Sequence, residues 1–144
     1  MIKTEFKQWI ENYDFEHAFE KTKSMSEDEI IEELGSLAYN AADNSVDKID
    51  LLAFSFAYKY KLLVDDIRWN YILMRLIESA YIWYKGMPDI VLECAHRLLE
   101  LDNTHLRALQ AIVDCYEHSV SHCTDEQYES AKNRMEELGY TMRS

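Results

Sequence analysis

Four residues near position 120 are the best candidates for chemistry: Cys115, His118, His122 and Cys123. On a helix, positions 115, 118 and 122 share one face, and Cys123 lies near the end of the same segment. Thiolate and imidazole groups at this spacing can hold zinc. However, the stretch His-Ser-Val-Ser-His lacks the glutamate of a hydrolytic zinc helix, and no C-x-x-C pair fixes the ligand geometry. The alternative is that Cys115 is part-buried packing and both histidines lie at a helix C-terminus, where their partial positive charge is favourable.

No other pattern in the sequence indicates catalysis. Three isolated glycines cannot build a phosphate-binding loop, and there is no G-x-S-x-G stretch and no Cys-His pair with an orienting group. Asp and Glu are plentiful, but a general acid or base needs a neighbour that shifts its pKa, and repeated carboxylates on exposed helix faces usually serve solvation. We therefore predict that the protein is not an enzyme and has no cofactor and no metal site, with zinc at the Cys-His cluster as the alternative.

The elements that carry these residues are predicted to be helices. The chain of 144 residues has three glycines and one proline, while 48% of it is hydrophobic and 29% is charged. Sandwiches, barrels and α/β folds need turn residues at short intervals, which this chain lacks. Its length suits one domain whose core needs no disulfide or metal. We predict a single all-α domain over residues 1–144.

The net charge of −12 indicates what kind of partner the surface favours. Residues 1–72 carry 15 acids and 8 Lys or Arg, and residues 73–144 carry 12 and 7, so the charge is spread along the chain. This field repels nucleic acid and anionic membranes and favours a basic protein, although acidity also simply keeps a small protein in solution. No uncharged apolar run approaches the roughly 20 residues of a membrane span. The odd cysteine count and a start without a signal-peptide apolar region favour a cytoplasmic location.

Capping residues and apolar stripes mark about eight helices, joined by short links and therefore antiparallel in pairs. Ser26 and Glu29 form a capping box before a stripe that continues as Ile30, Leu34, Leu37, Ala38 and Ala41. Gly86 and Gly139 suit helix ends, and Pro88 suits the first turn of a helix that runs to about 101. Other helix starts are predicted at residues with capping side chains: Asp14 after a break at Tyr13, Ser45, Asp65 or Asp66, Asn103 or Thr104, and Thr124.

Two of these helices have apolar patterns with further consequences. The helix after Ser45 carries a second apolar stripe, Leu51, Phe54 and Tyr58, beside its first one. A helix that is apolar on two sides is packed on two sides, so we expect it to be central. The helix that starts at Asp65 or Asp66 is expected to be long, with an inward stripe that continues through Trp69, Ile72, Leu73, Leu76, Ile77, Ala80, Tyr81 and Tyr84.

The stretch Gly-Met-Pro-Asp-Ile-Val-Leu-Glu-Cys-Ala-His-Arg-Leu-Leu-Glu-Leu-Asp, residues 86–102, resembles the tetratricopeptide (TPR) repeat, whose second helix ends in a similar Leu-Glu-Leu-Asp turn. The bulky and small positions of that family's second helix can be placed at four starts: Phe15, Val46, Pro88 and Tyr128. These starts are spaced by 31, 42 and 40 residues rather than by a constant 34. The resemblance implies a right-handed stack of helical hairpins. An irregular α-bundle is the alternative.

The TPR resemblance also implies a concave groove lined by the first helix of each pair. The register places eleven residues there: Glu29, Glu32, Tyr39, Asn40, Leu76, Trp83, Tyr84, Arg107, Asp114, Glu117 and His118. From these we predict that the residues that contact the partner are Glu29, Glu32, Tyr39, Trp83, Tyr84, Asp114 and Glu117. Aromatic rings bring contact area at low entropy cost, and carboxylates select a basic partner. The alternative for any single residue is a solvated helix face, or the core in the case of Trp83.

We therefore expect a non-enzymatic protein-binding module. Its most concrete form is a bacterial, cytoplasmic immunity protein that neutralises a basic, nuclease-type toxin, an analogy of class rather than a motif match. The alternative is a TPR-like adaptor or secretion chaperone that binds an extended peptide. We expect neither nucleic acid nor a membrane as the partner, and the sequence leaves the oligomeric state open.

Overall fold

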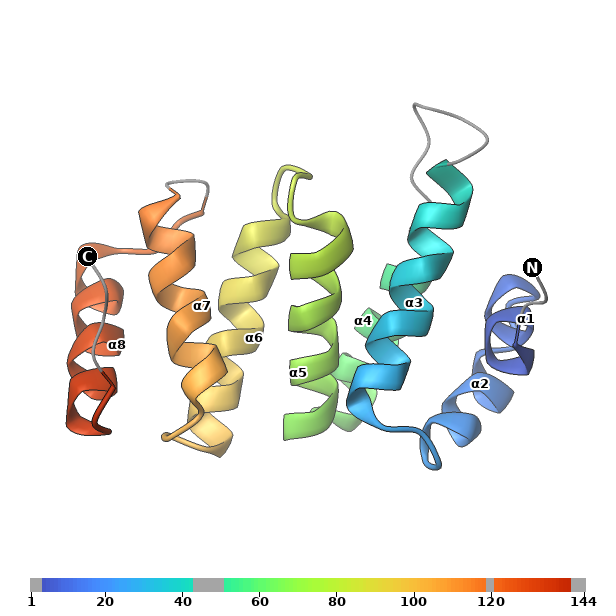
Figure 1. The fold of residues 1–144 in the computed structure, drawn as a ribbon, viewed down its shortest axis with the longest axis horizontal. Coiled ribbons are helices and arrows are strands. Elements are labelled where there is room, and N and C mark those ends of the chain that lie inside the picture. The colour runs from blue at the N-terminus through green and yellow to red at the C-terminus, as the bar shows by residue number, and fades with distance from the viewer. Residues whose placement is uncertain (1–3, 43–50, 119–120, 141–144) are drawn as a thin grey trace. The chain divides into compact units, whose positions relative to one another are not determined.

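The computed structural model describes residues 4–42, 51–118 and 121–140, and for residues 39–42 only the backbone. These residues form eight α-helices and one π turn: α1 Glu5–Glu11, α2 Phe15–Thr22, α3 Glu27–Ala42, α4 Leu52–Val64, α5 Ile67–Leu76, η1 Ile77–Tyr81, α6 Met87–Leu101, α7 Leu106–Glu117 and α8 Asp125–Glu137 (Figure 1). No strand occurs in them, so the predicted all-α class with about eight helices is confirmed. None of the described helices is long and apolar enough to cross a membrane.

The predicted helix starts are largely confirmed by their capping bonds. The side chains of Asp14, Asp66 and Thr124 each accept a hydrogen bond from a backbone N–H in the first turn of α2, α5 and α8. Ser26 and Glu29 form the predicted capping box: Glu29 N donates to Ser26 Oγ (3.1 Å), and Ser26 N donates to Glu29 Oε1 (3.4 Å). These contacts satisfy N–H groups that a helix itself leaves without partners.

Residues 1–80 form one compact unit, unit 1, which contains α1–α5. Within it α4 contacts α1, α3 and α5. The centre is aromatic, because the fully buried ring of Phe56 meets Phe6 (5.7 Å between centroids), Phe15 (5.3 Å) and Trp69 (5.9 Å), in each case edge to face. Such pairs add about 0.5–1.5 kcal/mol each beyond the burial of their area.

Only one side of α4 belongs to this core. Ala53, Phe56, Ala57 and Tyr60 are buried, as the first apolar stripe predicts. In the second stripe Leu51 is 48% exposed, while Phe54 and Tyr58 are half-buried and their rings stack on each other. The first stripe is thus confirmed as a packed side of this helix, and packing on a second side stays a prediction.

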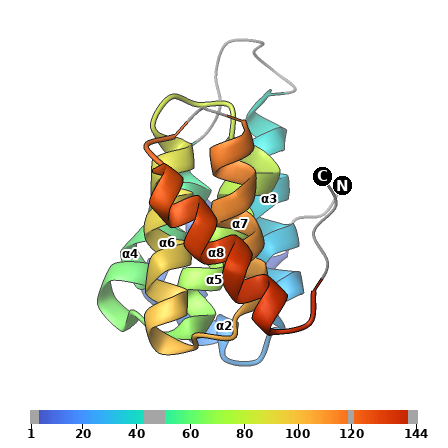
Figure 2. The ribbon, with the colours of Figure 1, turned by 90° about the vertical axis from the view of Figure 1, so that its left-hand side faces the viewer.

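Residues 81–144 form a second compact unit, unit 2, which contains α6–α8. The three helices alternate in direction, and α7 contacts both α6 and α8 (Figures 1 and 2). Apolar side chains from all three helices are buried in this unit: Val91, Ala95 and Leu98 of α6, Leu109 and Ile112 of α7, and Ala131 and Met135 of α8.

Two predicted boundaries are corrected by the structure. The long helix expected to run to Tyr84 ends as α5 at Leu76 and continues only as η1. Ile77, Ala80 and Tyr81 are still buried, but Tyr84 lies beyond the end of η1, in the turn before α6, and is 38% exposed instead of inward. The cap of α7 is His105, whose Nδ1 accepts from Ala108 N (3.2 Å), rather than Asn103 or Thr104.

The division into two units leaves two expectations untested. A single domain over residues 1–144 and the TPR-like stack both stay predictions. The predicted cap Ser45 and the repeat start Val46 lie outside the described residues.

Candidate interaction surface at one end of helices α6–α8

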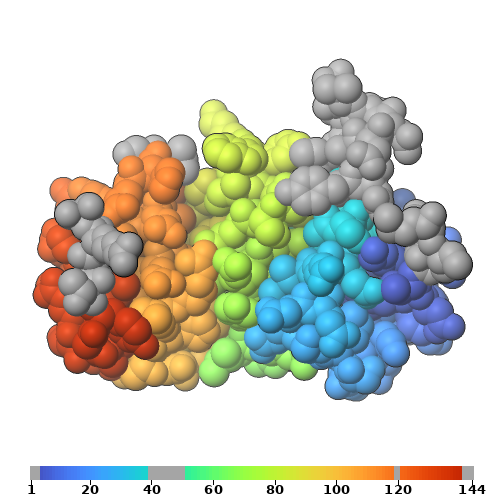
Figure 3. Space-filling model, in the orientation of Figure 1, coloured from blue at the N-terminus to red at the C-terminus, as the bar shows by residue number. Residues whose placement is uncertain are grey.

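The turn between η1 and α6 displays a tryptophan to solvent. Trp83 is 93% exposed, more than any other large apolar side chain in the part of the chain that the structure describes. The turn is fixed by hydrogen bonds from Tyr84 N to Tyr81 O (3.1 Å) and from Met87 N to Tyr84 O (3.0 Å) and by Gly86 at φ 92°. The yellow-green atoms of this segment project at the upper edge of Figure 3. A solvated tryptophan adds nothing to the core, and Trp is enriched at the centres of binding surfaces.

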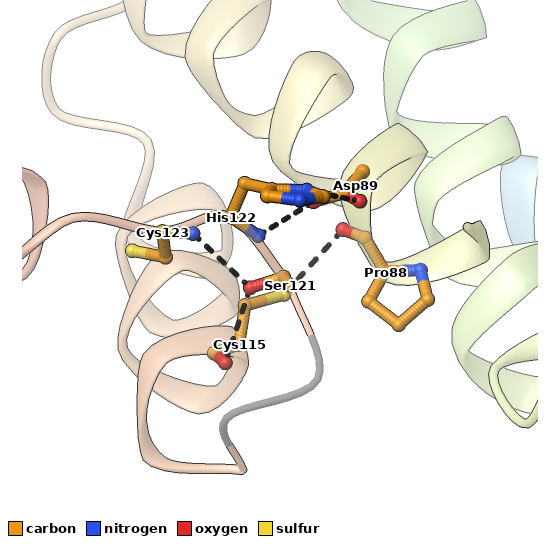
Figure 4. A network of polar contacts seen from close by, with 6 residues as sticks. All are labelled: Pro88, Asp89, Cys115, Ser121, His122 and Cys123. Carbon is orange, nitrogen blue, oxygen red and sulfur yellow. Dashed lines mark hydrogen bonds and ion pairs between the residues drawn. The ribbon is translucent and has the colours of Figure 1, made fainter. Parts of the chain in front are cut away.

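A network of polar contacts joins the start of α6 to the end of α7 below this turn (Figure 4). The carboxylate of Asp89 accepts from His122 N (2.7 Å) and lies 2.8 Å from His122 Nδ1. The backbone hydrogen bond from His122, joined by the contact with its ring, holds the pKa of Asp89 below its usual value. Cys115 Sγ donates to Pro88 O (3.7 Å), and Ser121 Oγ donates to Cys115 O (3.2 Å). The Trp83 turn and the last turns of α7 therefore lie at the same end of unit 2.

The two cysteines and two histidines of the zinc hypothesis each contact a different backbone or carboxylate oxygen. His122 faces Asp89, and His118 Nδ1 lies 2.7 Å from Asp114 O of its own helix. Cys123 Sγ faces Ile112 O (3.7 Å), and burial raises the pKa of its thiol, which disfavours the thiolate that zinc requires. No group of three or more His, Cys, Asp or Glu side chains in the described ranges is placed to hold a metal ion. In this arrangement the four side chains do not form a set of metal ligands.

Several carboxylates lie at the same end of unit 2 as the exposed tryptophan. Asp114 and Glu117 are both exposed and lie in the last turns of α7. Acidic side chains at a helix C-terminus oppose the helix dipole, which favours cations there by about 0.3–1 kcal/mol each. Asp125 and Glu126 add two exposed acids in the first turn of α8. Helix stability therefore explains the acids of α8 but not those of α7.

The arginines of α6–α8 lie toward the opposite end of the same helices. Arg97 is in the second half of α6, Arg107 in the first turn of α7 and Arg134 in the last turn of α8. Arg97 and Arg134 form ion pairs with Glu100 and Glu137, each at 2.9 Å. Arg107 reaches Asp114 only at 3.9 Å. All three arginines thus face carboxylates, and at the end with Trp83 the exposed acids Asp114, Glu117, Asp125 and Glu126 outnumber the exposed Lys85.

An aromatic pair at this end was not among the predicted partner-contacting residues. Tyr116 of α7 stacks on Tyr128 of α8, with ring centroids 4.2 Å apart. Tyr116 Oη donates to Asp125 Oδ1 (2.6 Å), and this hydrogen bond to a carboxylate raises the pKa of Tyr116. Both rings are half-buried. One feature of the sequence could have indicated Tyr116 as a contact residue: it stands next to Glu117 at the end of a predicted helix. We call Trp83, Tyr84, Asp114, Tyr116 and Glu117 together the Trp83 end.

Comparisons of the chain with protein-family models, with curated proteins and with solved structures give no match. The inference of function therefore rests on the residues of the Trp83 end.

The remaining predicted contact residues belong to α3 in unit 1. Glu32 is exposed, as is Glu29, whose carboxylate is engaged in the capping box with Ser26. The side chain of Tyr39 lies outside the described residues. Leu76, placed in the groove by register, is fully buried, so that assignment is wrong. The alternative that Trp83 belongs to the core is excluded by its exposure.

Proposed function

We propose that the protein is a non-enzymatic binding module that engages a basic protein through the Trp83 end. One observation carries the proposal: a tryptophan 93% exposed, at an end of unit 2 where the exposed acids Asp114, Glu117, Asp125 and Glu126 also lie. Exposed large apolar side chains in a charged setting are typical of interaction sites.

The two kinds of side chain have separate tasks in this proposal. The Trp83 ring, with Tyr84 beside it, is buried on binding and supplies the affinity, as buried aromatic anchors do. The carboxylates of Asp114 and Glu117 attract the basic partner over distance and set its orientation, which mainly raises the association rate. The rigid pair α6 and α7, joined by the Asp89–His122 contact, holds both parts in place before the partner arrives.

The most concrete form of the proposal is an immunity protein that covers the phosphate-binding active site of a nuclease toxin. A catalytic cleft that binds a nucleic acid backbone is positively charged, so its inhibitor has to be negative and needs no chemistry of its own. The net charge of −12 and the acidic Trp83 end support this form. A large secreted protein with a basic C-terminal domain, encoded directly upstream of this chain, would favour this form, and that basic domain would then be the probe.

The test measures association and dissociation rates of this probe with four forms of the full chain. For the wild type we expect a 1:1 complex of nanomolar affinity whose association rate falls as salt rises. Trp83→Ala should speed dissociation at least 10-fold, since loss of a buried anchor typically costs 2 kcal/mol or more. The double change Asp114→Lys with Glu117→Lys should slow association about 10-fold and flatten its salt dependence.

The matched control reverses two exposed acids at the other end of α8, Glu136→Lys with Glu137→Lys. It makes the same change in net charge, so a general field effect would slow association in both double variants equally. Equal slowing in both double variants, or rates that Trp83→Ala leaves unchanged, would show that the Trp83 end is not the binding surface. Micromolar binding of several isolated peptides in place of a folded partner would favour the adaptor alternative.

A further inference from the structure

The imidazole ring of His122 is exposed and yet fixed in direction. Its side chain is 94% exposed, and exposed side chains usually move freely among rotamers. Here the carboxylate of Asp89 holds it twice: Oδ1 accepts from the backbone N–H of His122 (2.7 Å), and Oδ2 lies 2.8 Å from Nδ1 of the ring (Figure 4). The two residues are 33 positions apart, so tertiary structure presents this ring to solvent.

The carboxylate also decides which ring nitrogen carries the hydrogen. Asp89 lies in the first turn of α6, where the helix dipole favours a negative charge. The backbone hydrogen bond from His122 and the contact with its ring hold the pKa of Asp89 below its usual value, so this carboxylate is ionised at neutral pH and can only accept hydrogen bonds. The neutral ring of His122 therefore has its hydrogen on Nδ1, which donates to Asp89, and Nε2 is left as an acceptor.

Nε2 of His122 has no hydrogen-bond partner within the described part of the chain. His17 of unit 1 provides a comparison, because the carboxylate of Asp14 lies near its backbone N (3.4 Å) and its Nδ1 (2.6 Å) in the same way. There the carboxylate caps the helix that carries His17, and the ring stacks on Trp9 at 5.6 Å between centroids. Local structure thus accounts for the ring of His17, whereas Nε2 of His122 is a fixed acceptor that the described fold does not use.

The surroundings of this acceptor favour a cationic donor. His122 stands shortly before α8, whose first turn carries the exposed acids Asp125 and Glu126. Its contact with Asp89 places it at the same end of unit 2 as the turn with Trp83. The acids repel an anion, while lysine and arginine side chains carry only donors and form stronger hydrogen bonds than neutral donors do. The group that fits Nε2 is therefore the ammonium or guanidinium group of a basic partner.

We propose that His122 belongs to the binding surface at the Trp83 end, where its Nε2 accepts a hydrogen bond from a lysine or arginine of the partner, and that Asp89 is the positioning residue that presents the ring. This inference rests on the proposed function and adds a third kind of contact to it. The Trp83 ring buries apolar area and the carboxylates act over distance, whereas His122 recognises a single donor. A ring that is already fixed loses little entropy when that donor binds.

The first measurement identifies the protonated ring nitrogen of His122 in the full chain without a partner, by long-range proton–nitrogen NMR above neutral pH. We expect the hydrogen of the wild-type ring on Nδ1. Asp89→Asn keeps an oxygen for the backbone N–H of His122 but turns an NH2 group toward Nδ1, so the hydrogen should move to Nε2 and the acceptor should be lost. A wild-type ring with its hydrogen on Nε2, or a ring that Asp89→Asn leaves unchanged, would overturn the role of Asp89.

The second measurement is the dissociation rate of the complex with the basic domain that is the probe of the proposed function. His122→Ala removes the ring but keeps the backbone hydrogen bond to Asp89. It should speed dissociation about 10-fold, as expected for the loss of one hydrogen bond from a charged donor. Asp89→Asn should do the same. The double variant should dissociate no faster than His122→Ala alone, because Asp89 acts only through the ring.

The matched control is His17→Ala, which removes a carboxylate-bound ring from unit 1 and should leave the dissociation rate unchanged. Trp83→Ala separates the two proposals. If it speeds dissociation and His122→Ala does not, the proposed function stands and this inference is wrong. If neither variant changes the rate, the partner does not use the Trp83 end and both are wrong. Additive effects of His122→Ala and Asp89→Asn would show that Asp89 stabilises the fold and does not act through the ring.

Discussion

The guanidinium of Arg68 connects the start of α5 to the end of α2. Its Nη2 donates to Thr22 O (2.6 Å) and Met25 O (2.8 Å), carbonyls of the last residue of α2 and of the following link. Terminal helix carbonyls have no partner within the helix, and hydrogen bonds from a charged donor contribute more than neutral ones. Arg68→Ala should lower the unfolding free energy of unit 1 by about 2–3 kcal/mol in urea titrations.

The control for this residue is Lys23→Ala in the same region. Lys23 pairs with Glu20 at 3.0 Å, but both side chains are more than 60% exposed. Exposed pairs contribute about 0–1 kcal/mol, so this change should be barely measurable. Equal losses in the two variants would show that the Arg68 contacts do not stabilise the fold.

His96 of α6 gives unit 2 a pH dependence. The residue is half-buried, and its Nε2 has no hydrogen-bond partner in the described structure. Burial lowers the pKa of His96, and the nearby Glu100 opposes this only in part. Below the ordinary pKa of about 6.5 the unfolded chain binds the proton and the folded chain does not, so stability falls as the pH drops from 7.5 to 5.5. His96→Leu should reduce that decrease of the urea midpoint. An equal decrease in the variant would exclude His96 as its cause.

At the scale of the element, helix starts are the best predicted features because they depend on a few neighbouring residues. Asp14, Ser26 with Glu29, Asp66 and Thr124 cap the helices that their sequence positions indicate. His105 was missed because histidine is an uncommon cap and Asn103 and Thr104 were the better candidates by type. The end of α5 was missed because a π turn leaves no mark in an apolar stripe.

The link between α1 and α2 contains a residue in a strained conformation. Tyr13 has φ 61°, a region that costs residues other than glycine about 1–2 kcal/mol, and its side chain is 77% exposed. Tyr13→Gly removes this strain and loses little packing, while it adds about 0.5–1 kcal/mol of entropy to the unfolded chain. The net expectation is a gain of about 0.5–1 kcal/mol in unfolding free energy.

The neighbouring Asn12 serves as the control, because it is also exposed but has an ordinary φ of −91°. Asn12→Gly relieves no strain and should lower stability. If both variants lose stability in thermal denaturation, the positive φ of Tyr13 is not a source of strain in solution.

At the scale of the molecule, the fold class could be predicted from the sequence and the net charge counted in it. The positions of charged and exposed apolar side chains on the surface could not be predicted. Periodicity identified the apolar side of most helices and indicated two apolar sides in α4, yet it could not show how far each side is buried. Of the predicted contact residues, the structure gathers Trp83, Tyr84, Asp114 and Glu117 at one end of unit 2. That gathering depends on the Asp89–His122 and Pro88–Cys115 contacts between residues about 30 positions apart, which a local pattern does not contain.

The division into units 1 and 2 leads to a prediction about how the whole chain unfolds. Arg68→Ala acts within unit 1, whereas Met135→Ala removes a buried side chain from unit 2 at a typical loss of 2–5 kcal/mol. In hydrogen–deuterium exchange, the first variant should speed amide exchange in α1–α5 and the second in α6–α8. Each variant thus serves as the control for the other. If either change speeds exchange equally in all eight helices, the chain opens as one cooperative domain over residues 1–144, as its length and composition predict.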